Sequence, residues 1–127
     1  MRGVSTVIAD RGGATAVEFS LIAPALLLLL FGIAEVGRLL WTQSALHFAV
    51  EEAARCAAVD ATNCASAAAV QRFAVARAAG LGLQNSVFSL AKPACGTEVS
   101  ASYAFSFVTS ALFPYSVTLT ARSCFPQ

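Results

Sequence analysis

Four cysteines are the residues with the clearest chemistry in this sequence. None of them has the C-x-x-C spacing of a common zinc site, and the chain contains a single histidine, His47. A zinc site would need an unusual set of ligands, so disulfide bonds are the favoured interpretation. Disulfides persist in oxidising compartments such as the bacterial periplasm. The four residues are Cys56, Cys64, Cys95 and Cys124.

Four cysteines allow three connectivities, and geometry favours pairing Cys56 with Cys64 and Cys95 with Cys124. An unbroken helix would hold the first two about 12 Å apart, beyond disulfide reach, but residues 60–63 interrupt the helical pattern and let the chain return. Cys95 precedes the first long strand pattern and Cys124 ends the second, so a hairpin would bring them together. Each bond would stabilise the domain by roughly 2–4 kcal/mol.

Enzymatic and ligand-binding chemistry finds little support in the sequence. It lacks the G-x-S-x-G, P-loop and H-E-x-x-H motifs, and a formal net charge of +1 offers no basic surface for nucleic acid. His47 and Glu51 are one helical turn apart, but two such residues on an exposed helix are more often solvated than metal-bound. We therefore expect no enzyme activity, no metal or other cofactor, no small-molecule substrate and no nucleic-acid partner.

The main element that must position these residues is an apolar helix near the N-terminus. The chain is 57% hydrophobic and 12% charged, and residues 19–34 read FSLIAPALLLLLFGIA without a charge. If Glu35 and Arg38 are tolerated, the segment extends to Trp41 and spans about 34 Å, enough for the hydrocarbon core of a bilayer. Trp41 would then stand at the membrane–water interface. The sequence predicts a transmembrane helix.

The residues around the apolar segment bear on orientation and on competing interpretations. Arg2 and Arg11 precede it, which favours a cytoplasmic N-terminus and an exported C-terminal part. A secretory signal peptide fits less well, because the run is long and no good A-x-A cleavage site follows it before Glu35. Two alternatives stay open: an uncleaved signal anchor whose periplasmic domain binds a ligand or partner, and a small protein secreted after cleavage behind the run.

A glycine pair and one carboxylate stand immediately before the apolar run. Residues 11–19 read RGGATAVEF. A carboxylate at the membrane edge is costly unless it has a partner. If a peptidase cut after Gly13, Ala14 would become the N-terminus, with Glu18 fifth and Phe19 sixth. The new α-ammonium group of a neighbouring subunit would be a natural partner for Glu18.

The residues before and within the apolar run resemble the class III signal of type IV pilin-like proteins. That signal consists of a glycine, four further residues, a glutamate followed by an aromatic residue, and some twenty apolar residues. Within that group, RGGATAVEFSLIAPALLLLLFGIAEVGR resembles the TadE family of tight-adherence (Tad, or Flp) pilus systems. The resemblance extends over residues 11–60. It implies that a prepilin peptidase cuts between Gly13 and Ala14, and that Glu18 is required for processing or assembly. Because the major subunits of such pili are shorter, it also implies a minor subunit or assembly factor.

The remainder of the chain predicts an α+β domain of pilin-like plan. Apolar residues at helical spacing continue the first helix as an amphipathic stem, and either Asn63 or Ser66 would cap a second helix that Gly80 ends. Further along, the period changes to the alternation of half-buried antiparallel strands. The expected elements are a stem over 42–58, a helix running to Ala79, and strands over 86–90, 97–108 and 115–122.

These observations give a three-part organisation and a structural role. We expect a leader peptide over 1–13, a transmembrane segment over 14–41 and a periplasmic α+β domain over 42–127. The expected function is that of a minor pilin-like subunit, or pseudopilin, in Tad/Flp pilus assembly. The protein would cross the bacterial inner membrane once, and its expected partners are a prepilin peptidase, other pilin-like subunits and the Tad assembly machinery.

Overall fold

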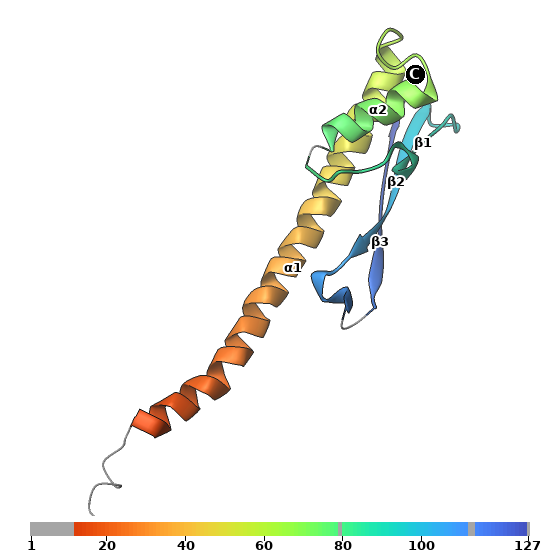
Figure 1. The fold of residues 1–127 in the computed structure, drawn as a ribbon. Helices are drawn as coiled ribbons and strands as arrows, with labels where there is room; N and C mark the ends of the chain where they lie inside the picture. Colours follow the sequence, from red (N-terminus) through yellow and green to blue (C-terminus); the bar gives the residue numbers. More distant parts are fainter. Residues whose placement is uncertain (1–11, 79, 112–113, 127) are drawn as a thin grey trace, which may run out of the picture. The chain divides into compact units, whose positions relative to one another are not determined.

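The computed structural model describes residues 12–78, 80–111 and 114–126, and the expected leader up to Arg11 lies outside them. The described part is α+β, as the sequence predicts. It separates into two units, one ending at Val36 and one beginning at Gly37, and the first helix runs through both. Figure 1 shows the elements in chain order, which are α1 (Gly12–Val59), α2 (Ala67–Arg77), the 3-10 turn η1 (Asn85–Val87), β1 (Phe88–Ala91), β2 (Thr97–Ser106), the 3-10 turn η2 (Val108–Ala111) and β3 (Ser116–Phe125).

Helix α1 is continuous from Gly12 to Val59. Among the described residues it is the one helix long and apolar enough to cross a membrane, and none of its most apolar stretch is buried. Pro24 lies inside the helix although it has no amide hydrogen to donate to the carbonyl of Ser20. Transmembrane helices tolerate proline more readily than exposed helices in water. The predicted stem over 42–58 is confirmed as the C-terminal part of α1.

The hydrophobic core lies in the unit that begins at Gly37 and draws on both helices and all three strands. Alanine supplies much of the α1 face, so the partner elements can approach its backbone closely. The largest fully buried apolar side chain is that of Phe88 at the start of β1. The other large contributors are Leu46 and Val50 from α1, Val70 from α2, Val99 and Phe105 from β2, and Leu119 from β3.

The three strands form one antiparallel sheet in the order β1-β2-β3. Strand β2 pairs with β3 along its full length, from Thr97 opposite Phe125 to Ser106 opposite Ser116. The alternation predicted for β2 is confirmed, with alternate residues buried from Thr97 to Ala101 and again at Phe105. The short strand predicted at 86–90 lies at 88–91 instead, because pairing with β2 begins where Phe88 enters the core.

Helix α2 begins after Ser66, whose Oγ accepts a hydrogen bond from the Ala69 amide at 3.2 Å. Of the two expected caps, Ser66 is therefore the one used. The helix ends at Arg77, earlier than expected, and Ala79 lies outside the described residues. The Gln71 side chain donates to the carbonyl of Phe88 at 2.8 Å, which ties α2 to β1.

Two disulfides bind the ends of these elements together. Cys56 and Cys64 are joined across the turn after α1, with their Cα atoms 5.8 Å apart. Cys95 and Cys124 join the approach to β2 with the end of β3, at 6.4 Å. These are the pairs that the sequence favours. By the loop-closure model the shorter loop contributes about 2.5 kcal/mol and the longer about 3.6 kcal/mol.

The turn inside the smaller disulfide loop is held by Asp60. Its carboxylate accepts hydrogen bonds from the Asn63 side chain at 2.7 Å and from the amides of Asn63 at 2.9 Å and Thr62 at 3.0 Å. The Asn63 side chain, followed by the two amides, lowers the pKa of Asp60 below its ordinary value of 3.8. Asp60 therefore holds the turn after α1 in its charged form.

The Asp60→Asn variant should lose less stability than the wild type when acidified. A lowered folded-state pKa contributes stability above the unfolded value near 3.8, and this contribution disappears as the pH falls through the lower folded value. Denaturant unfolding at neutral pH and at about pH 2–3 measures the difference. Equal losses in the two proteins would show that the Asp60 charge is not linked to folding.

Candidate assembly and processing site

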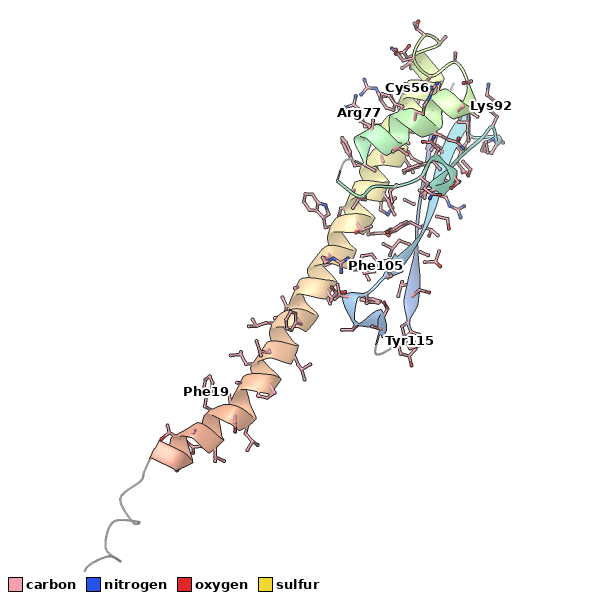
Figure 2. All side chains as sticks on the ribbon, viewed as in Figure 1. Phe19, Cys56, Arg77, Lys92, Phe105 and Tyr115 are labelled. Atoms are coloured by element: carbon pink, nitrogen blue, oxygen red, sulfur yellow. A yellow bond between two sulfur atoms is a disulfide. The ribbon has the colours of Figure 1, made fainter. Side chains whose placement is uncertain are left out.

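The four residues expected to direct processing all lie on the first turns of α1. Gly13, Ala14, Glu18 and Phe19 are helical and exposed, and Phe19 leaves 73% of its surface free. Figure 2 labels Phe19 near the start of the helix. Ala14 and Glu18 are four residues apart, so they share one face at a rise of about 6 Å. A carboxylate here stands among apolar neighbours with no protein covering it.

The helix face that carries Glu18 continues through small residues. Glu18, Ala25 and Gly32 are spaced by seven, and seven residues of α-helix return to the same side with a drift of about 20°. We call this side the Glu18 face. The spacing can be seen in the sequence, but the three residues share one side only because α1 is unbroken through Pro24.

A shallow groove of about 440 Å³ opens on this part of the helix around Gly32. A methyl group added at Gly32 would meet nothing within 4 Å, so the backbone is open to a neighbour. Small residues in such a position let helices approach closely in a membrane. The groove is lined by Leu28, Leu29, Gly32, Ile33 and Val36.

The opposite side of the helix carries a second pair of small residues. At about 100° per residue, Ala23 and Ala34 lie within 20° of each other and roughly opposite Ala25 and Gly32. These four small residues of α1 therefore lie on two opposite faces. The arrangement allows α1 to contact one helix on each side.

The other residues considered from the sequence lie in the second unit. The four cysteines form the two disulfides, so none is available as a metal ligand. Nε2 of His47 lies 2.9 Å from Nε2 of Gln43, one turn earlier on α1. Within the part of the chain that the structure describes, no three His, Cys, Asp or Glu side chains gather where they would hold a metal ion.

Comparison with protein-family models matches residues 13–55 to the family described as TadE-like protein. Over this segment the chain is similar to the TadE-like family. The TadE-like segment begins at Gly13, contains the whole Glu18 face and its groove, and ends one residue before Cys56. The resemblance seen in the sequence is thereby confirmed over most of α1. Comparison with curated proteins and with solved structures gives no match.

Proposed function

We propose that this chain is a minor pilin-like subunit of Tad/Flp pilus assembly, with a structural rather than an enzymatic role. The TadE-like match over residues 13–55 supports a pilin-like role related to the Tad pilus. The observation that carries the proposal is the Glu18 face. It combines one exposed carboxylate and an apolar groove around Gly32 on a helix whose most apolar stretch is fully exposed.

In the proposed assembly, a prepilin peptidase cuts after Gly13 and leaves Ala14 as the first residue. The Glu18 carboxylate then meets the α-ammonium group of Ala14 on a neighbouring subunit, which removes the cost of an unpaired charge at the membrane edge. The groove around Gly32 receives the neighbouring helix. The opposite face with Ala23 and Ala34 contacts the next subunit, since head-to-tail assembly requires two different surfaces on each copy.

Location follows from the same features. Helix α1 anchors the protein in the bacterial inner membrane, and Arg2 and Arg11 favour a cytoplasmic N-terminus. Residues 42–127 are then periplasmic, where the two disulfides form and persist. The exported domain presents contacts to other pilin-like subunits and to the Tad machinery.

The N-terminus of the membrane-extracted protein tests the processing step. Mass spectrometry should find Ala14 as the first residue when the protein is expressed with a prepilin peptidase, and Met1 when it is expressed without one. A Gly13→Leu variant provides the control, because a bulky residue at the cleavage position should keep the leader attached without shortening the apolar helix.

A start at Met1 under both conditions would contradict processing. The chain would then be an uncleaved signal anchor with a partner-binding periplasmic domain. A start beyond residue 34 with a soluble product would instead identify a secreted protein.

A further inference from the structure

The hairpin formed by β2 and β3 carries its charged residues, Glu98 and Arg122, away from its tip, where it exposes apolar side chains. From Val99 to Ala121 the chain contains no Asp, Glu, Lys or Arg. We define the hairpin tip as the described residues 106–111 and 114–117. Within it, Val108 and Tyr115 each leave 72% of their surface exposed, and Val117 leaves 41%. Edge strands that face water are usually protected by charged residues, and this tip has none.

The opposite end of the sheet is different in character. Lys92 stands in the turn between β1 and β2, and Glu98 pairs with Ala91 at the same end. Figure 2 shows Lys92 and Tyr115 at opposite ends of the hairpin. The Asp60 turn adds another charged group to the unit. The end of the sheet near Lys92 therefore carries charged side chains that favour water, whereas the hairpin tip carries none.

Two contacts fix which end of α1 lies beside the hairpin tip. The Gln43 side chain donates to the carbonyl of Thr120 at 2.9 Å, and Thr120 pairs with Ser102. One and a half turns earlier on α1, the Arg38 guanidinium lies 5.3 Å from the centre of the Phe105 ring. The five residues from Gln43 back to Arg38 span about 7.5 Å of α1, and over that length the contact on β2 shifts from the level of Ser102 to Phe105, three residues nearer the tip. The tip lies at the end of this unit where α1 enters it.

The residues of α1 at that level are typical of a membrane surface. The apolar run ends at Ala34, and Trp41 leaves 70% of its surface exposed. Arg38 and Trp41 line a polar cleft of about 430 Å³ together with Tyr103 of β2. Tryptophan, tyrosine and arginine at the end of a transmembrane helix commonly occupy the headgroup layer.

From these observations we propose that the hairpin tip inserts into the interfacial layer of the bilayer that α1 crosses. Val108, Tyr115 and Val117 would bury apolar surface among lipid headgroups and upper acyl chains, and the tip carries no charged side chain that would have to be desolvated there. The domain would then be held at the membrane by α1 and by the tip. This inference rests on the membrane anchoring in the proposed function.

Lipid quenching of tryptophan fluorescence tests the insertion directly. Trp41 is the only tryptophan, so a Trp41→Phe background leaves a single reporter when Tyr115→Trp is added. The full chain is reconstituted at low density in phosphatidylethanolamine–phosphatidylglycerol vesicles whose acyl chains are brominated. We expect about twofold quenching with Tyr115→Trp, as for an interfacial aromatic residue, and no quenching with the matched control Lys92→Trp.

Each outcome has a distinct meaning. Wild-type Trp41 and flotation with the vesicles report anchoring by α1. Val108→Trp in the Trp41→Phe background provides a second reporter. If the bromolipids quench Trp41 but quench neither Tyr115→Trp nor Val108→Trp, the proposal is overturned while the anchoring stands. The tip would then face a protein partner or water. Failure to float with vesicles would overturn the anchoring and the tip insertion together.

Discussion

Glu18→Gln should leave the chain in the membrane but reduce its incorporation into pili by about 100-fold or more. The substitution keeps the size of the side chain and removes its charge, so the α-ammonium of a neighbouring Ala14 loses its partner in an apolar surrounding. Breaking a buried ion pair on one side costs about 3–5 kcal/mol, and each 1.4 kcal/mol is a factor of ten. Quantitative immunoblotting of purified pili and of membranes measures the two pools.

The matched control is Glu51→Gln, which removes an exposed glutamate farther along the same helix. It should leave incorporation unchanged, because its neighbours are solvated. Glu18→Asp should recover part of the wild-type level, since it restores the charge on a shorter side chain. Normal incorporation of Glu18→Gln would show that the carboxylate has no role in assembly, even if Ala14 is confirmed as the N-terminus.

Gly96→Ala should destabilise the unit that begins at Gly37 by about 3–5 kcal/mol, because it combines a strained backbone with forced overlap. Gly96 has a φ of +125°, a conformation that L-residues rarely adopt. A Cβ there would overlap the carbonyl oxygen of Phe125 and lie 2.9 Å from the Cα of Pro126. Both are backbone atoms at the end of β3, next to the Cys95–Cys124 bond, so they cannot turn away.

Denaturant unfolding of the oxidised protein measures this loss, and Gly80→Ala provides the control. Gly80 also has a positive φ, +89°, but a Cβ there would meet nothing within 4 Å. The control should lose only about 1–2 kcal/mol, the cost of the left-handed conformation. Similar losses in the two variants would mean that the backbone overlap at Gly96 is relieved by movement of β3.

The features that the sequence predicted best were those governed by local pattern. An uncharged apolar run produces a long helix whatever surrounds it, and the alternation predicted over 97–108 produces a strand with one buried face that ends at Ser106, where the turn η2 follows. The start of β1 was less predictable. Ser86 and Val87 fit a strand pattern, but the pairing partner of Phe88 on β2 decides where the strand begins, and that partner is thirteen residues away.

In the candidate site, too, the features set by local spacing could be predicted from the sequence, and those set by distant contacts could not. Gly13 and Glu18 were singled out from their spacing before the apolar run, and their role in processing stays a prediction. The relation of Glu18 to Gly32 depends on α1 staying continuous through Pro24, which single-residue propensities disfavour. The contact of Arg38 with Phe105 joins residues far apart in sequence, and nothing in the charge or size of either residue specifies the other.

The order of the strands has a consequence for how the proposed periplasmic domain would fold. Each strand pairs with its neighbour in the chain, so the sheet needs only hairpin closures of short range. A chain translocated behind its N-terminal helix can form β1 and β2 before β3 arrives. The disulfide of Cys95, however, can form only after Cys124 at the far end of β3 has been added. A chain that stalls before the last strand would display an open β2 edge and an unpaired Cys95 thiol, and both would disappear when β3 pairs and Cys124 arrives.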